Sequence, residues 1–247
     1  MGKKTESKAS LTLAEPKKLI NCIKAINGLV DEVLLRVKQD GLQIIAMDPA
    51  NVAMAVFTFK KEGFVEYDVP KDLSAGVSLT SLSQILSRAK SDEDVLKLEF
   101  GDRINIGITG KVKKSFGLSI IEMDEKAEKV PELAPKATIK LQTKILQDAI
   151  DDADLVADNC SFICEKGKFS IKAEGDLSNA RVEMLEADIV VAEDKAVKSK
   201  YSVEYLKKML IGNIAKDVKV RYGEDYPLRL DYKKDNIELG FILAPRI

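Results

Sequence analysis

Four stretches of the chain carry apolar residues at helical spacing. The clearest one follows Pro16, where Leu19, Ile23, Ile26 and Val30 recur every three or four positions. Proline is itself favoured in the first turn of a helix. The spacing predicts four helices, which begin near Lys17, Thr80, Thr143 and Ser202.

Other segments alternate apolar and polar residues with a period of two. VLKLEF at 95–100, FSIKAEG at 169–175 and VKVRYG at 218–223 all follow this pattern. Such alternation is typical of antiparallel strands that bury one face. The chain therefore mixes amphipathic helices with half-buried antiparallel strands, which indicates an α+β fold.

The second half of the chain repeats the first. Segment 11–48 is similar to 139–176, and each reads as a short strand, a helix, a strand, a glycine turn and another strand. Segment 78–108 pairs in the same way with 201–232. A unit made of a helix and several antiparallel strands is therefore expected four times, two in each half.

The segment between the halves, 122–136, is acidic, contains two prolines and has no clear hydrophobic period. These features are typical of a linker. The expected organisation is a disordered lead at 1–10, one domain at 11–121, a connecting loop at 122–136 and a second domain at 137–247.

One connection between strands has an unusual composition. The segment 41–59 reads as two strands, but its polar break DPAN lacks the glycines that tight hairpins favour. Met47, Val52 and Met54 place apolar side chains beside this break. Two interpretations stay open at this point, either core residues at strand ends or a small apolar binding surface.

The composition is that of a folded, highly charged protein. Of 247 residues, 45% are hydrophobic and 32% are charged, and the net charge is −1. No apolar run reaches the roughly 18 residues that a membrane span needs, and the first ten residues lack the apolar core of a signal peptide. We therefore expect a cytosol-like location without a membrane partner, and only the placement of the lysines decides whether one face is basic.

Little in the chain favours catalysis. Histidine is absent, which removes the commonest general base and metal ligand. Cys160 and Cys164 could be a metal pair, but buried core cysteines are the simpler interpretation. An acidic run in the third helix could be imagined as a metal-carboxylate nuclease site, although such runs are usually solvated; it contains Asp148, Asp151, Asp152 and Asp154. We expect no catalytic residue, no metal and no cofactor.

Several motifs together resemble a known family. GLQIIAMDPANVAMAVFTF, EGDLSNARVEM, DYPLRLDYK and the end LAPRI appear in that order, in two equivalent halves joined by an acidic connector. From about Leu11 to Ile247 the chain resembles the archaeal and eukaryotic sliding clamps, the proliferating cell nuclear antigen family.

The resemblance implies a fold and a function. Three subunits would close head to tail into a ring of six similar domains, with helices lining a hole that holds duplex DNA. Such a clamp has no catalytic activity and tethers DNA polymerase, flap endonuclease and DNA ligase, while a clamp loader opens it. It would act on chromosomal DNA, in the cytoplasm of an archaeal-type cell or in a eukaryotic nucleus.

The resemblance also implies a partner-peptide site, which answers the question raised by segment 41–59. Partner peptides, the PIP-box peptides of this family, would insert one aliphatic and two aromatic side chains there, with roughly micromolar affinity because a flexible tail must be ordered. Glu128 stands where eukaryotic relatives carry an apolar residue, so one wall is expected to be more polar. The peptide site is predicted at Met47, Asn51, Val52, Met54, Val130, Pro131, Tyr226, Pro227, Leu243, Ala244 and Pro245.

In the ring that the resemblance implies, one face of each helix would point into the hole, at the phosphates of DNA. The sequence departs from the family here, because the third helix is acidic, Ile211 stands where lysine is common, and Gln84 and Ser87 replace basic residues. Fewer phosphate contacts would give weaker and less salt-sensitive binding. The DNA-facing residues are predicted to be Lys17, Asn21, Lys24, Arg88, Lys90, Lys207, Lys208 and Lys216.

Ring closure would pair an edge strand of one subunit with an edge strand of the next, at 113–120 and 177–185. The apolar contacts of this joint are predicted at Phe116, Leu118, Ile120, Leu177, Val182 and Met184. Ordinary strands within one subunit remain the alternative. Two further alternatives stay open for the whole chain, one subunit of a heterotrimeric clamp and a peptide-binding scaffold that does not encircle DNA.

Overall fold

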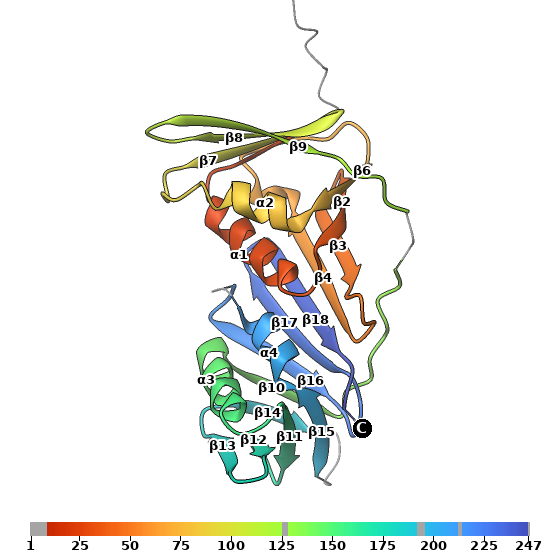
Figure 1. Cartoon of the computed structure of the whole chain (residues 1–247), viewed down its shortest axis with the longest axis vertical. Coiled ribbons are helices and arrows are strands. Elements are labelled where there is room, and N and C mark those ends of the chain that lie inside the picture. The colour runs from red at the N-terminus through yellow and green to blue at the C-terminus, as the bar shows by residue number, and fades with distance from the viewer. Residues whose placement is uncertain (1–8, 125–127, 192–195, 212–213, 247) are drawn as a thin grey trace, which may run out of the picture. The chain divides into compact units, whose positions relative to one another are not determined.

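The computed structural model describes residues 9–124, 128–191, 196–211 and 214–246 (Figure 1). Of the predicted disordered lead at 1–10, residues 1–8 lie outside the described residues, as do 125–127 of the predicted connecting loop. Ala9 and Ser10 were expected in that lead, but they begin a strand and pair with Phe100 and Glu99. Contacts divide the chain into two compact units. The first contains Met1–Ala46, Val56–Glu128 and Asp235–Glu238, and the second contains Met47–Ala55, Lys129–Lys234 and Leu239–Ile247.

The first half of the chain forms two helices, nine strands and one short 3-10 helix within its described residues. One sheet has the strand order β5-β1-β7-β8-β9, and another run of strands has the order β4-β3-β2-β6. The helices α1 and α2 contact each other (Figure 1). The elements are β1 (Ala9–Leu13), α1 (Pro16–Asn27), β2 (Glu32–Lys38), β3 (Gly41–Met47), β4 (Ala53–Lys60), η1 (Lys61–Gly63), β5 (Glu66–Asp68), β6 (Leu73–Ser78), α2 (Leu79–Leu86), β7 (Val95–Phe100), β8 (Arg103–Thr109) and β9 (Lys113–Ser119).

The second half repeats this order of helices and strands. Its strands run β13-β12-β11-β15 and β14-β10-β16-β17-β18, and α3 contacts α4. The elements are β10 (Ala137–Gln142), α3 (Thr143–Asp154), β11 (Asn159–Glu165), β12 (Lys168–Glu174), β13 (Asn179–Met184), β14 (Asp188–Val191), β15 (Val197–Ser202), α4 (Val203–Leu210), β16 (Asp217–Tyr222), β17 (Leu228–Lys234) and β18 (Ile237–Leu243).

The pairing of the strands confirms the internal repeat. In the first half β1 pairs with β5 and β7, and in the second half the equivalent strand β10 pairs with β14 and β16. Likewise β2 pairs with β3 and β6, while β11 pairs with β12 and β15. All of these pairs are antiparallel, and each of the four helices begins within one residue of its predicted start. The predicted α+β class is therefore confirmed.

Two glycine turns have clear physical reasons. Gly41 adopts a φ of 153°, and a Cβ there would lie only 2.4 Å from the carbonyl oxygen of Phe59. Gly167, in the equivalent turn of the second half, has a φ of 74°, in the region that favours glycine.

The core is apolar, as the alternating patterns predict. In the second unit the rings of Phe162, Phe169, Tyr201 and Tyr222 pack together, with edge-on contacts at centroid distances such as 5.3 Å between Phe162 and Tyr201. Aromatic pairs at this spacing favour such tilted geometry. Within the described residues no helix is both long and apolar enough to cross a membrane.

Candidate functional site

A buried carboxylate holds the turn between β3 and β4. Asp48 is 4% exposed. Its Oδ1 accepts hydrogen bonds from the N–H groups of Val52 and Ala53, both at 2.7 Å, and its Oδ2 accepts one from the N–H of Ala50 at 3.2 Å. Asn51 adopts a φ of 58°, a conformation that asparagine tolerates better than most residues. The turn therefore forms without glycine, because an aspartate bonds its backbone and an asparagine takes the left-handed position.

The C-terminal tail is attached to this turn. The N–H of Ala244 donates to the carbonyl of Val52 at 2.8 Å, and the N–H of Arg246 donates to the carbonyl of Lys200 on β15 at 2.7 Å. Pro245 lies between these two anchors and is half-buried. The tail therefore links the turn to the edge strand β15 and keeps part of its apolar surface accessible.

The loop after β16 and the connector are also joined. The carbonyl of Tyr226 accepts a hydrogen bond from the hydroxyl of the fully buried Tyr201 at 2.7 Å. The phenolic oxygen of Tyr226 accepts one from the N–H of Ala134 at 3.3 Å. Val130 and Pro131, earlier in the connector, are half-buried and exposed respectively. Tyr226 thus connects two of the segments that were predicted to form the peptide site.

All eleven predicted peptide-site residues belong to the second unit. Nine of them keep accessible surface. Met54 and Leu243 do not, because they are only 4% and 1% exposed on strands that turn them into the core. These two predicted residues therefore pack in the core of their unit and present almost no surface to a partner.

The predicted DNA-facing residues of α1 share one side of that helix. Lys17, Asn21 and Lys24 follow one another at spacings of four and three, and the two lysines are exposed opposite the buried side. The Nζ of Lys17 forms an ion pair with Asp92 at 2.6 Å. No ion-pair partner of Lys24 is found among the described residues.

Arg88 and Lys90 lie just beyond α2, and both side chains are exposed. Asp94 accepts hydrogen bonds from the backbone N–H groups of Lys90 and Ser91 at 2.8 and 3.0 Å, so this turn is also held by a buried carboxylate. The Nζ of Lys114 donates to the carbonyl of Arg88 at 2.8 Å.

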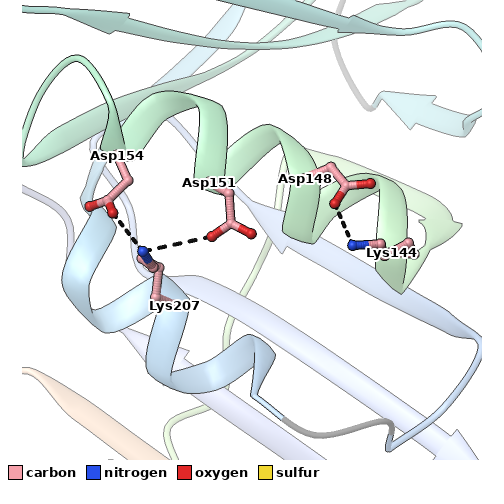
Figure 2. Close-up of polar contacts among 5 residues, drawn as sticks. All are labelled: Lys144, Asp148, Asp151, Asp154 and Lys207. Atoms are coloured by element: carbon pink, nitrogen blue, oxygen red, sulfur yellow. Dashed lines mark hydrogen bonds and ion pairs between the residues drawn. The ribbon is translucent and has the colours of Figure 1, made fainter.

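In the second unit, three of the four aspartates of the acidic helix α3 take part in ion pairs (Figure 2). The Nζ of Lys207 on α4 lies 2.5 Å from a carboxylate oxygen of Asp154 and 3.7 Å from one of Asp151. Lys144 forms a second pair with Asp148 at 2.6 Å, four residues on. The hydrogen bond to Asp154 raises the pKa of Lys207. Much of the positive charge predicted to face DNA at Lys207 is thus directed at the neighbouring helix.

The other two cations of the predicted set differ from each other. Lys208 pairs with Glu204 at 2.7 Å, and its Nζ lies 5.2 Å from the ring centroid of Tyr205. Lys216 lines a cleft of about 740 Å³ next to the start of α3, together with Lys144 and Lys234. Basic side chains gather at this cleft, and Lys234 was not predicted from the sequence.

The two strands predicted to join subunits lie at sheet edges. β9 ends the order β5-β1-β7-β8-β9, and β13 ends the order β13-β12-β11-β15. Phe116 and Val182 are half-buried at these edges. Ile120 is 36% exposed, and Leu177 is fully exposed. Leu118 and Met184 are 8% and 5% exposed, so they already pack inside their own unit and add little to a joint.

The described residues contain no group of three or more histidine, cysteine or acidic side chains that could hold a metal ion. Cys160 and Cys164 are buried, and burial raises the pKa of the Cys160 thiol to about 12. Both therefore act as core residues.

Two residues that organise the site were not identified from the sequence. Asp48 directly precedes a Pro-Ala-Asn break, and aspartate at the start of a turn often bonds the backbone two to five residues on, so a local signal was present. Tyr205 donates its hydroxyl to Asp48 from 157 residues away, and no local pattern indicates such a contact.

Comparison with known proteins gives matches along almost the whole chain. Residues 8–128 match the family "Proliferating cell nuclear antigen, N-terminal domain", and residues 129–247 match "Proliferating cell nuclear antigen, C-terminal domain". The chain is 32% identical over 238 residues to the DNA polymerase sliding clamp of Thermococcus fumicolans, covering 94% of this chain and 95% of the relative. It is also 32% identical over 245 residues to the DNA polymerase sliding clamp of Nanoarchaeum equitans, covering 96% and 98%.

Solved structures agree with these matches. The crystal structure of the nuclear antigen from Thermococcus kodakaraensis aligns with a TM-score of 0.90 at 26% identity, covering 96% of this chain and all of that one. The nuclear antigen from Entamoeba histolytica aligns with a TM-score of 0.91, covering 98% of this chain and all of that one, and at 19% identity it supports the fold alone.

Proposed function

This chain belongs to the proliferating cell nuclear antigen family, and we propose from this membership that three identical copies close into a ring around duplex DNA. The chain is a DNA sliding clamp, a processivity factor of DNA replication. The observation that carries this conclusion is the match of both family domains, in order, across 8–247. A scaffold that binds peptides without encircling DNA is not favoured by that match.

In our proposal the ring is joined through the edge strands β9 and β13. Among the described strands, each has a neighbour on one side only, and pairing with another copy would satisfy the row of backbone groups on the other side. Head-to-tail contacts of this type close into a ring when the rotation between copies suits. The apolar side chains at these edges that remain accessible would be covered on closure; they are Phe116, Ile120, Leu177 and Val182.

The peptide site is the second part of the proposal. Within one unit the turn 48–52 is hydrogen-bonded to the tail, and the loop around Tyr226 is hydrogen-bonded to the connector. All four segments keep apolar surface accessible. A partner peptide with aromatic anchors would bury about 150–250 Å² for each aromatic side chain on such a surface. We propose that DNA polymerase, flap endonuclease, DNA ligase and a clamp loader bind here.

For DNA, we propose a sequence-independent inner surface in which α1 and the residues after α2 carry more of the available positive charge than α3 and α4. Lys24, Arg88, Lys90 and Lys216 form no ion pairs among the described residues, whereas Lys207 and Lys208 are paired. Fewer free cations give a smaller dependence of DNA binding on salt. A closed ring needs little affinity, since its topology retains it on DNA.

The proposal also covers catalysis, location and domain division. In our proposal the clamp tethers enzymes and catalyses no reaction itself, as its membership of the sliding-clamp family implies. It acts at chromosomal DNA, in the cytoplasm of an archaeal-type cell or in a eukaryotic nucleus. Its two clamp domains extend over 11–121 and 137–247, with a connecting loop at 122–136.

The test is retention on DNA of defined topology. The purified chain is loaded onto nicked circular plasmid by a clamp loader with ATP, and the bound fraction is separated by gel filtration in high salt. A ring stays on the circle and is lost once a restriction enzyme linearises the plasmid. Equal retention on circular and linear DNA, or none on either after loading, would contradict the proposal.

A further inference from the structure

Asp48 makes a hydrogen bond that the turn itself does not need. Three backbone N–H groups already approach its carboxylate, two at Oδ1 and one at Oδ2. The fourth donor is the hydroxyl of Tyr205 on α4, which lies 2.7 Å from Oδ2. The Oδ2 bond from Ala50 is the longest of the four, so Tyr205 supplies the shorter contact to that oxygen and thereby resists rotation of the carboxylate.

The turn held by this carboxylate is not one that the backbone adopts readily. Asn51 lies in the left-handed region with a φ of 58°. The N–H of Asp48 also donates to the carbonyl of Ala53 at 2.8 Å, which closes the turn. The carbonyl of Val52, which precedes Ala53, accepts the N–H of Ala244, so the orientation of the turn also determines where the C-terminal tail is anchored.

We propose that Asp48 and Tyr205 are a positioning pair for partner binding, in which the Tyr205 hydroxyl holds the Asp48 carboxylate in the orientation that preorganises the turn 48–52 and the tail. The inference rests on the proposed peptide site, to which neither residue was assigned. A surface ordered before binding loses less conformational entropy when a peptide docks. Tyr205 therefore sets peptide affinity from a position behind the contact surface.

The ionisation of the two groups agrees with this geometry. Burial alone would raise the pKa of Asp48, but the hydrogen bonds from Ala53, Tyr205, Val52 and Ala50 together lower it below its ordinary value. The hydrogen bond to Asp48, followed by burial, raises the pKa of Tyr205 to about 12. The carboxylate is therefore charged and the phenol protonated near neutral pH, as the donor and acceptor roles require.

The decisive variant is Tyr205→Phe in the full chain, because it removes one oxygen atom and keeps the ring. The probe is a fluorescein-labelled synthetic peptide with one aliphatic and two aromatic anchors, titrated by fluorescence anisotropy. Amide hydrogen exchange is followed by NMR without peptide. We expect Kd to rise threefold or more, and exchange to accelerate at Val52, Ala53 and Ala244.

Tyr232→Phe is the matched control. Its hydroxyl donates to the carbonyl of Met209 at 3.2 Å, in the same unit, and the side chain is 1% exposed. Both phenylalanine variants should shift the melting temperature by at most about 4 °C. Only Tyr205→Phe should change Kd and the exchange rates of the turn.

Substitutions at Asp48 provide a rescue series. Asp48→Ala removes all four acceptor contacts, whereas Asp48→Asn keeps one carbonyl oxygen and can restore part of them. Peptide affinity is expected to fall in the order wild type, Asn, Ala. If Asp48 served only to stabilise the fold, the variants would differ in melting temperature. Their peptide affinities would then be equal at temperatures where every variant is folded.

Three results would overturn the inference or its premise. Unchanged Kd and unchanged exchange in Tyr205→Phe would refute the positioning pair. An equal loss of affinity in Tyr232→Phe would show a general stability effect and would refute it too. If the wild type binds no peptide, or Met47→Ala and Pro245→Ala leave its affinity unchanged, the peptide site itself is wrong, and the exchange rates then report separately whether Tyr205 holds the turn.

Discussion

Two methionines of the same strand pair are predicted to respond differently to truncation. Met47 ends β3 with accessible surface, whereas Met54 on β4 is 4% exposed. Replacing each by alanine therefore separates a residue that lines the peptide site from one that supports it. Met47→Ala should weaken peptide binding with little effect on folding. Met54→Ala should mainly destabilise the protein.

The expected magnitudes follow from burial. Truncating a buried methionine to alanine typically costs about 2–5 kcal/mol, which for a chain of this size lowers the melting temperature by about 4–20 °C. Truncating a side chain that a bound peptide covers costs on the order of 1–2 kcal/mol of binding free energy. That loss corresponds to a Kd about 5–30-fold higher.

The assay combines anisotropy titration of the labelled peptide with thermal unfolding of each variant. Met209→Ala is the control for Met54→Ala, because Met209 is also fully buried in the second unit but lies on α4. Leu155→Ala is the control for Met47→Ala, since Leu155 is 83% exposed at the end of α3 and outside the peptide site. Peptide affinity is compared at a temperature where all variants are folded.

Opposite results would refute specific steps of the reasoning. If Met47→Ala and Pro245→Ala both bind peptide like the wild type, the peptide site is assigned to the wrong surface. If Met54→Ala keeps the melting temperature of the wild type, the packing of β4 against the core is wrong.

Three further predictions concern DNA, the ring and pH. Lys24→Ala should reduce the slope of log K against log salt for DNA binding by about 0.9 for each copy in the ring whose Lys24 contacts a phosphate. Lys207→Ala should reduce it by less, because two aspartates already offset its charge; equal changes in a salt titration would contradict this. Val182→Lys places a charge in the proposed joint at β13 and should lower the native mass measured by gel filtration. The control Val190→Lys, on the edge strand β14, should leave the native mass unchanged. Loss of the oligomer in both variants would argue against this joint. The folded-state pKa of Asp48 lies below its ordinary value of 3.8, so the carboxylate stabilises the turn at higher pH and loses this effect as pH falls through the folded pKa. The difference in peptide affinity between wild type and Asp48→Asn should therefore be constant from about pH 5 to 9. A steep change within that range would contradict this assignment of the charge.

Much of the fold follows from local sequence patterns. The spacing of apolar residues within each segment predicts the helices and strands such as β7, β12 and β16. This spacing is local, so it can be read without knowing the tertiary contacts. The duplication could be recognised because both halves preserve the same order of periods and glycine turns. The edge position of β9 and β13 was expected only from the family resemblance.

The side-chain contacts of the site could be predicted from the sequence less well than the fold. Whether a strand residue near a turn faces the core or a surface depends on strand pairing, so Met47 and Met54 looked alike in the sequence. The use of Lys207 by Asp151 and Asp154 depends on how α3 and α4 pack, and these residues lie more than fifty positions apart. The bond between Tyr205 and Asp48 likewise exists only in the folded chain.

The central claim is that copies of this single chain close into a ring by themselves. The most direct measurement is the native mass of the purified chain alone, by light scattering over a dilution series. Three copies of a 27.3 kDa chain give about 82 kDa, and the proposed ring predicts that mass at micromolar concentration. A mass that stays at 27.3 kDa throughout the series would contradict the account, since the joints would then require different subunits or other strands.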